Sequence, residues 1–161
     1  MTAHDLAGAV VAGCIARGLT FATAESLTAG LVAATIAEIP GCSAMLRGSV
    51  VAYHADLKQE LLGVPEGAMA QGPVSRDVAL AMAQGARRVL GSDIGVATTG
   101  VAGPDPHGGD PAGSVWIAVS GPSGERAEHL MIEGSRQDVR TTTVEACLAL
   151  VAAELTESVG E

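Results

Sequence analysis

The chain has 161 residues, which is the usual size of one domain with its own core. Its formal net charge of −9 argues against nucleic acids and anionic membranes as partners, because both bind basic surfaces. Hydrophobic residues make up 48% but aromatic residues only 2%, so the core must consist mainly of Ala, Val, Leu and Ile. We therefore expect a single domain over residues 1–161 with closely packed small side chains.

The location of the protein follows from its hydrophobic stretches. The longest uncharged apolar runs, residues 6–16 and 27–37, are much shorter than the ~20 residues that a membrane span needs. No basic and apolar leader with a cleavage site is recognisable, which predicts a cytoplasmic protein. Cys14, Cys42 and Cys147 lack a Cys-x-x-Cys spacing, and we expect buried free thiols.

The first part of the chain predicts a helix, a strand and a second helix. Residues 3–17 show apolar positions near helical period, residues 20–24 are short and partly β-branched, and residues 27–39 are Ala-rich. Glu25 and Ser26 therefore lie where a strand turns into a helix. Ser26 is either a helix N-cap, the commoner role, or a nucleophile served by the free N–H groups of the helix start.

The next segment carries the least common residue types of the chain. Residues 45–54 predict a strand and residues 55–62 a short helix with Lys58, the single lysine beside eight arginines. Since arginine keeps its proton in proteins, a lone lysine indicates a neutral base, and a solvated surface lysine is the alternative. Tyr53, the single tyrosine, is expected to relay a proton between Ser26 and Lys58 or to bind substrate, unless it merely ends the strand.

The middle of the chain predicts a loop that suits an anion. Residues 63–74 are expected to form a loop, residues 75–90 a helix and residues 94–99 a buried strand. Residues 100–112 are the stretch richest in Gly and Pro. Closely spaced N–H groups over residues 99–103 suit a phosphate or carboxylate, although neither a Walker loop nor a Gly-x-Gly-x-x-Gly fingerprint is present. A plain connection is the alternative.

The last part predicts a hairpin and a long helix. Residues 113–120 and 125–132 are expected to pair as antiparallel strands, and residues 135–156 to form a helix with a capping box. Arg136 and Arg140 are four residues apart, so they share one face of that helix. They form either a phosphate clamp or a solvated pair matched to acidic neighbours.

The order of the elements predicts an α/β fold. Early alternation of helices and strands, followed by a late β-hairpin, indicates a three-layer α/β/α sandwich with a mostly parallel mixed sheet. In such sheets ligands collect at the carboxyl ends of the strands. Four candidate segments end there: Ser26, residues 53–58, residues 98–103 and residues 134–140. We expect one shared cleft.

Metals and histidines give weaker indications. Lys58 is a better base than His54, because burial shifts an amine pKa toward neutrality. Hard-ion ligands occur without a specific spacing in two places, Asp105 with His107 and Asp110, and His54 with Asp56. We predict neither a metal site nor a cofactor.

Five motifs follow one another along the chain: Glu25-Ser26-Leu27-Thr28-Ala29-Gly30, Tyr53 with Lys58, Thr99-Gly100-Val101-Ala102-Gly103-Pro104, Gly113-Ser114-Val115-Trp116, and Gly134-Ser135-Arg136-Gln137-Asp138-Val139-Arg140. In this order, over about residues 5–156, they closely resemble the CinA C-terminal-domain family, the nicotinamide-nucleotide amidases, in its stand-alone form. Leu27 and Ala29 stand where relatives often have Cys and Gly.

The resemblance implies an α/β/α fold and hydrolysis of nicotinamide mononucleotide to nicotinate mononucleotide and ammonia, a step of pyridine-nucleotide salvage. It implies Ser26 as the nucleophile, Tyr53 and Lys58 as the activating pair, and no metal. Backbone N–H groups at the start of the second helix are expected to hold the oxyanion. The expected substrate contacts are Glu25, Leu27, Thr28, Gly30, Thr99, Gly100, Ala102, Gly103, Arg136 and Arg140.

The partners follow from the same hypothesis. We expect a small-molecule nucleotide as substrate and, from the Ala-, Gly- and Val-rich composition, a homo-oligomer. The alternative is a non-catalytic nucleotide-binding or protein-interaction module of the same fold. The presence of Ser26, Tyr53 and Lys58 together argues against it, because such a module does not need all three.

Overall fold

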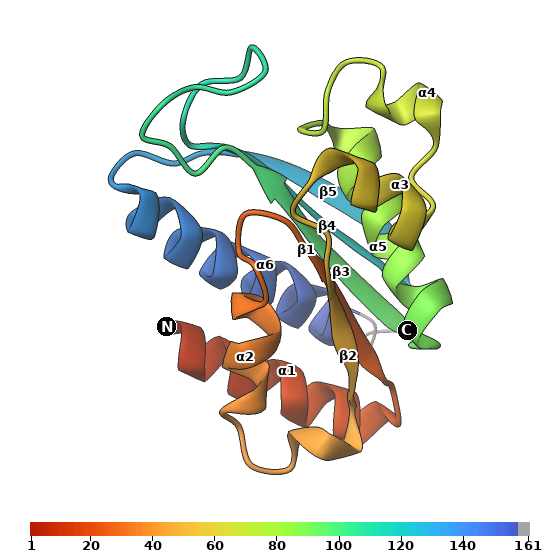
Figure 1. Ribbon diagram of the computed structural model, residues 1–161. Helices are drawn as coiled ribbons and strands as arrows, with labels where there is room; N and C mark the ends of the chain where they lie inside the picture. Colours follow the sequence, from red (N-terminus) through yellow and green to blue (C-terminus); the bar gives the residue numbers. More distant parts are fainter. Residues whose placement is uncertain (158–161) are drawn as a thin grey trace.

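The computed structural model describes residues 1–157 and shows one open sheet between two layers of helices (Figure 1). In chain order the elements are α1 (Ala3–Arg17), β1 (Phe21–Glu25), α2 (Leu31–Ala37), the 3₁₀ turn η1 (Cys42–Ala44), β2 (Leu46–Val51), α3 (Ala55–Leu62), α4 (Glu66–Met69), α5 (Arg76–Leu90), β3 (Ile94–Gly100), β4 (Ser114–Gly121), β5 (Gly124–Met131) and α6 (Arg136–Glu157).

The sheet has five strands in the order β2-β1-β3-β4-β5. β1 is parallel to both β2 and β3, whereas β4 is antiparallel to β3 and β5. Four strands therefore run in one direction and only β4 is reversed. The predicted three-layer sandwich with a mostly parallel mixed sheet and a late hairpin is confirmed.

Each face of the sheet has its own core. Alternate strand residues point to opposite faces, so Phe21 and Val96 pack with α1, α2 and α6, whereas Ala22 and Ala97 pack with α5. The second face is closely packed, since a Cβ at Gly95 would lie 2.2 Å from the Ala83 carbonyl oxygen of α5. The small residues noted in the composition thus let α5 lie directly on the sheet.

The expected free thiols are present, with one difference in burial. Cys14 and Cys147 are fully buried in the first core, but Cys42 is only half-buried on η1. Burial raises the pKa of the Cys14 thiol to about 11 and raises that of Cys147 as well. Both core thiols therefore stay protonated and pack as small hydrophobic groups.

Several predicted boundaries agree with the structure, because glycines in left-handed conformation end the helices. Gly18, Gly63 and Gly91 follow α1, α3 and α5 with φ of 63°, 65° and 64°. Other predictions are wrong. The loop expected over residues 63–74 contains the short helix α4, and the strand expected over residues 45–54 is limited to β2.

The second predicted helix also begins later than expected, at Leu31 instead of residue 27. Residues 26–30 form an irregular turn, in which Ala29 has φ of +49° and Gly30 has φ of +97°. Left-handed residues cannot continue a right-handed helix. The helix axis therefore starts one turn after Ser26.

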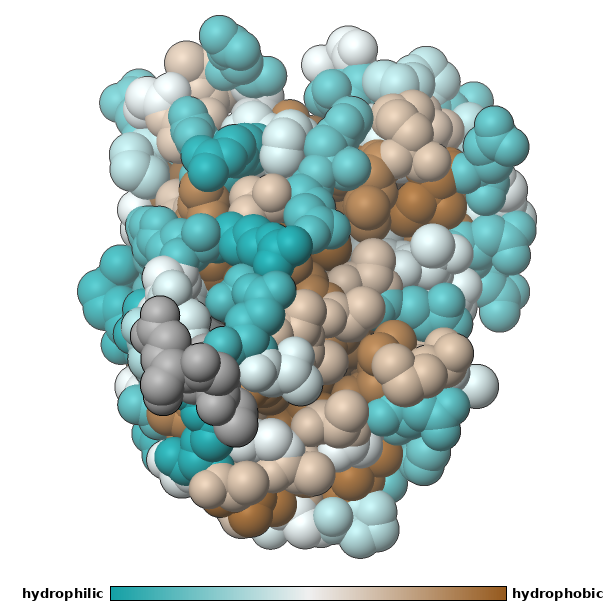
Figure 2. All heavy atoms as spheres, turned by 180° about the vertical axis from the view of Figure 1, so that it is seen from behind, coloured by the Kyte–Doolittle hydropathy of each residue, from teal (hydrophilic) through white to brown (hydrophobic). Residues whose placement is uncertain are grey.

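The loops beyond the carboxyl ends of β1 and β3 gather at one end of the sheet. In Figure 1 the 101–113 segment projects on one side of this end, and α4 projects on the other. Seen from behind in the space-filling view, a notch separates these two projections (Figure 2). The cleft that contains Ser26 and Lys58 lies at this end.

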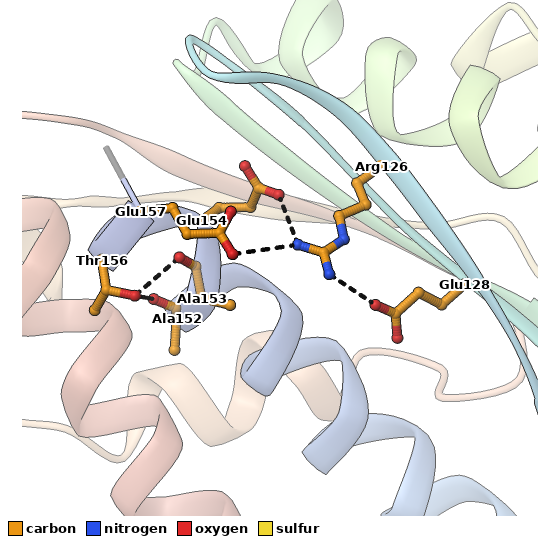
Figure 3. Close-up of polar contacts among 7 residues, drawn as sticks. All are labelled: Arg126, Glu128, Ala152, Ala153, Glu154, Thr156 and Glu157. Carbon is orange, nitrogen blue, oxygen red and sulfur yellow. Dashed lines mark hydrogen bonds and ion pairs between the residues drawn. The ribbon is translucent and has the colours of Figure 1, made fainter. Parts of the chain in front are cut away.

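The opposite end of the sheet is tied to α6 by charged groups. The guanidinium of Arg126 on β5 lies 3.5 Å from a Glu154 carboxylate oxygen and 3.7 Å from one of Glu157, both on α6 (Figure 3). It also lies 3.6 Å from Glu128. Within residues 1–157, no helix has the length and apolar character to cross a bilayer.

Candidate active site

A cleft of about 690 Å³ lies at the carboxyl ends of β1 and β3. Its walls come from segments that are far apart in the sequence. They are Ser26 and Leu27; Tyr53, His54, Ala55 and Lys58; Pro73 and Val74; Thr99, Gly100, Val101, Ala102, Gly103, Pro104, Asp105, Pro106 and His107; and Arg136. The four predicted segments therefore meet in one place.

Ser26 and Lys58 are in direct contact in this cleft. The Lys58 Nζ donates a hydrogen bond of 2.8 Å to the Ser26 Oγ. Two carbonyl oxygens complete the surroundings of the amine, Ala52 at 2.8 Å and Tyr53 at 3.2 Å. The Lys58 amine is thus directed toward the Ser26 hydroxyl by α3, which carries it, and by the two carbonyl groups that follow β2.

Burial changes the acid–base behaviour of Lys58. The residue is only 1% exposed, and no carboxylate is among its hydrogen-bond partners. Desolvation therefore lowers the pKa of the Lys58 ammonium to about 8. A substantial fraction of the amine is neutral just above neutral pH, as a general base requires.

Ser26 is held by the neighbouring strand. Its side chain is nearly buried at 7% exposure, and its backbone N–H donates to the Thr98 carbonyl oxygen at 3.1 Å. The Thr28 and Thr98 hydroxyls are 2.8 Å apart on the inner side of the same turn. Thr28 is fully buried and does not line the cleft, so it supports the turn instead of the expected substrate contact.

Glu25 also has a role other than the expected one. Its side chain is 0% exposed, and its carboxylate accepts from the backbone N–H groups of Val32 at 2.8 Å and Ala33 at 3.1 Å. The Thr23 hydroxyl adds a third bond at 2.9 Å. A carboxylate is well placed at a helix N-terminus because the helix dipole is positive there. Glu25 is absent from the lining of the cleft, and it anchors α2 to the sheet.

This arrangement corrects the expected oxyanion site. N–H groups in the first turn of α2 are occupied by Glu25, and Gly30, the residue just before that helix, is outside the cleft lining. The Leu27 amide is a better donor, because Leu27 follows Ser26, lines the cleft, and has no acceptor for its N–H within residues 1–157. An amide directly after the nucleophile is a common oxyanion donor.

Tyr53 lies at the mouth of the cleft and is 54% exposed. Its hydroxyl accepts a 2.9 Å hydrogen bond from Arg136 Nη2, whereas Lys58 reaches Ser26 directly. The geometry therefore does not support a proton relay through the phenol. It leaves the second expectation for Tyr53, a contact with the substrate.

Of the two arginines expected to form a clamp, only Arg136 lines the cleft. Arg136 Nη1 donates to the Gly103 carbonyl oxygen at 2.6 Å, which joins α6 to the glycine-rich loop. Arg140 donates instead to the carbonyl oxygens of Leu27 at 2.9 Å and Thr28 at 3.3 Å. Arg140 is thus bound to the turn after Ser26 and is not part of the cleft wall.

The glycine-rich loop forms the wall opposite α3. Thr99, Gly100, Ala102 and Gly103 all line the cleft, and the Thr99 hydroxyl donates to the Pro73 carbonyl oxygen at 2.6 Å. Bulkier residues do not fit at Gly100, where a Cβ would lie 2.7 Å from the Ser114 carbonyl oxygen. Gly100 is therefore required by the close packing of the end of β3 against β4.

Comparison with known proteins decides the family. Residues 3–155 match the family described as the CinA C-terminal domain. The chain belongs to the CinA C-terminal domain family. It is 50% identical over 137 residues to a putative competence-damage inducible protein of Desulforamulus reducens, and 43% identical over 148 residues to a CinA-like protein of Frankia casuarinae. These matches cover 84% and 91% of this CinA domain.

This CinA domain spans about a third of the length of those curated relatives, 33% and 34%. Solved structures of similar size agree with its fold. A CinA superfamily protein from Klebsiella pneumoniae superposes with a TM-score of 0.92 at 28% identity, covering 98% of this chain and 99% of that one. A competence/damage inducible protein from Agrobacterium tumefaciens gives 0.90 at 34% identity, with 96% and 95% covered.

Some contacts and residues of the site have no signal in the sequence. Thr98 lies in the candidate segment 98–103, but its hydrogen bond with the Ser26 amide could not be recognised, because a threonine in a buried strand has no distinctive pattern. Pro73 and Val74 line the cleft from a segment that showed only turn residues. No group of three metal-ligating side chains is present in the described part of the chain.

Proposed function

We propose that this CinA domain hydrolyses the carboxamide of nicotinamide mononucleotide to nicotinate mononucleotide and ammonia. The observation that carries the proposal is the 2.8 Å contact between Lys58 Nζ and Ser26 Oγ in an open cleft. A buried amine with a lowered pKa next to a hydroxyl is the arrangement of a serine hydrolase that uses lysine as base. The family resemblance supplies the substrate.

In the first half of the reaction the neutral Lys58 amine takes the Ser26 Oγ proton while Oγ bonds to the carboxamide carbon. The Leu27 amide would stabilise the oxyanion of the tetrahedral intermediate. Lys58 then returns its proton to the amide nitrogen, the C–N bond breaks, and ammonia leaves. Ser26 is left as an ester of the nicotinate.

In the second half, water replaces ammonia. Lys58 takes a proton from the water, whose oxygen bonds to the ester carbonyl carbon. The intermediate collapses, the bond to Ser26 Oγ breaks, and Oγ regains a proton from Lys58. The product is released from Ser26 as the carboxylic acid and loses its carboxyl proton to water, which gives nicotinate, and the enzyme returns to its starting state.

The anionic end of the substrate would bind at the mouth of the cleft. Arg136 and the loop over residues 99–103 are joined by a 2.6 Å hydrogen bond, so they form one wall and need not be alternatives. The Arg136 guanidinium would face a phosphate together with loop N–H groups other than that of Val101, which donates to the Ser114 carbonyl oxygen. The Tyr53 hydroxyl, bonded to Arg136, would orient the same group.

The test is ammonia release from nicotinamide mononucleotide by the wild-type chain and by Ser26→Ala. We expect release by the wild type and a loss of at least 10²- to 10³-fold in Ser26→Ala. Equal release by both proteins would contradict the role of Ser26. Binding of the nucleotide without release by the wild type would favour the non-catalytic module.

A further inference from the structure

The turn after Ser26 has a backbone conformation that its sequence does not favour. Ala29 has φ of +49° and is the only residue other than glycine with positive φ in residues 1–157. A Cβ crowds the backbone in this region, so residues other than Gly, Asn and Asp rarely adopt it. Contacts from the rest of the fold must therefore hold Ala29 in place.

Arg140 supplies such contacts from α6, more than a hundred residues further along the chain. Its Nε donates to the Leu27 carbonyl oxygen at 2.9 Å and its Nη2 to the Thr28 carbonyl oxygen at 3.3 Å. The carbonyl and N–H of a trans peptide point in opposite directions. The planar guanidinium therefore also determines where the N–H groups of Thr28 and Ala29 point.

The other side of the turn is fixed by β3. Thr98 accepts from the Ser26 N–H at 3.1 Å and pairs with the Thr28 hydroxyl at 2.8 Å. The turn is thus clamped between β3 and α6, with Ser26 and Leu27 facing the cleft. Arg140 itself does not line the cleft, unlike Arg136 one helical turn before it.

The geometry points to Arg140 as a positioning residue for Ser26. It keeps Ala29 in its left-handed conformation, so that the Ser26 hydroxyl faces the carbonyl carbon of the reacting group while the Leu27 amide faces the oxygen of the same group. The inference rests on the proposed nucleophile but not on the identity of the nucleotide. Since Arg140 acts through the backbone of the turn, its loss should lower kcat and leave KM nearly unchanged.

The experiment measures Ser26 reactivity without the nucleotide. A small alkyl fluorophosphonate phosphonylates an activated serine: the Oγ–P bond forms, the P–F bond breaks, fluoride leaves and Lys58 takes the proton. The second-order rate constant is measured for the wild type, Arg140→Lys, Arg140→Met and Ala29→Gly, and for Arg140→Met combined with Ala29→Gly. Mass spectrometry confirms that the label is on Ser26.

We expect Arg140→Met to lower the labelling rate constant by about tenfold or more, as small misplacements of reacting groups do. Arg140→Lys keeps the charge but lacks the paired donors, so it should also be slowed. Glycine tolerates positive φ, so the loss from Arg140→Met should shrink by about threefold or more in the Ala29→Gly background. In nucleotide turnover the loss should appear in kcat.

Arg47→Met is the matched control, because Arg47 Nε also donates to a backbone carbonyl, that of Leu90, at 2.9 Å and outside the cleft lining. It should label at the wild-type rate. The inference is overturned if Arg140→Met labels like the wild type, if Arg140→Lys keeps the full rate, or if the loss is equal in both Ala29 backgrounds. Should Arg140→Met fail to fold, Arg140→Lys with and without Ala29→Gly gives the same comparison.

The outcomes also separate this inference from the proposed function. If the wild-type chain is labelled at Ser26 but releases no ammonia, nicotinamide mononucleotide is not its substrate. The comparison of labelling rates then still tests the role of Arg140. If the wild-type chain is neither labelled nor active on the nucleotide, both Ser26 as the nucleophile and Arg140 as its positioning residue are contradicted. Normal turnover with unchanged labelling of the variants would overturn only the role of Arg140.

Discussion

At the scale of residues, the basic side chains of the site differ in their contacts and therefore in their roles. Lys58 is buried with only neutral partners, so desolvation lowers its pKa. Arg136 and Arg140 share one face of α6, yet one lines the cleft and the other holds the turn after Ser26. Residue type alone does not determine a role, because the role depends on what the side chain contacts.

The lowered pKa of Lys58 predicts a pH dependence. Because the reactive form is the neutral amine, kcat/KM for ammonia release should rise with pH through an apparent pKa of about 8 and then level off. Lys58→Arg keeps the charge but cannot supply a neutral base, so turnover should be lost at all these pH values. A profile that is flat between pH 6 and about 9, or normal turnover by Lys58→Arg, would contradict Lys58 as the base.

At the scale of elements, the first two turns of α6 join three parts of the site. Arg136 reaches the glycine-rich loop and Tyr53, and Arg140 reaches the turn after Ser26. A capping box starts this helix: the Ser135 N–H donates to an Asp138 carboxylate oxygen at 2.8 Å, and the Asp138 N–H donates to Ser135 Oγ at 3.1 Å. The bonds that the Ser135 N–H and hydroxyl donate to the Asp138 carboxylate lower the pKa of this carboxyl.

Removal of this cap should weaken substrate binding. Ser135→Ala is expected to cost about 1 kcal/mol of helix stability, fraying the turn that carries Arg136. We expect KM to rise up to about fivefold with a smaller change in kcat. Thr2→Ala is the matched control, since Thr2 and Asp5 form the same capping box on α1, away from the cleft. Equal KM effects of both variants, from steady-state kinetics, would contradict this.

At the scale of the whole molecule, the two ends of the sheet differ in structure. The carboxyl ends of β1 and β3 carry the cleft, whereas the ion pairs of Arg126 join β5 to the last turn of α6 at the other end (Figure 3). Arg126 pairs there with three glutamates, Glu128, Glu154 and Glu157, in a chain of net charge −9. The expected nucleotide partner and homo-oligomer stay predictions.

Arg126→Gln should therefore affect stability but not activity. The side chain is 44% exposed, and exposed ion pairs contribute about 0–1 kcal/mol. We expect Tm to fall by about 2 °C at low ionic strength, and less at high salt because screening weakens the remaining repulsion among the glutamates. Ammonia release should be unchanged. A Tm loss that is the same at low and high salt in calorimetry would mean that packing, not charge, is involved.

The local sequence predicted those features that depend on neighbours along the chain. The helices over residues 3–17 and 55–62 begin and end as expected, because apolar spacing and the terminal glycines decide them. The sequence also singled out Ser26, Lys58, Tyr53 and Arg136, whose residue types are rare here or whose motifs are specific, and the structure places all four in one cleft. Their catalytic and binding roles stay proposals.

Only the tertiary structure decided where the buried polar groups point. Glu25 was expected to contact substrate, but its carboxylate is bound by N–H groups seven and eight residues away, after a turn that the sequence predicted as helix. Arg140 binds carbonyl groups 112 and 113 residues away. Such contacts form because the sheet and α6 bring distant segments together, and each buried donor or acceptor then takes the nearest partner that satisfies it. The chain determines the reactive groups, and the fold determines which of them reach the cleft.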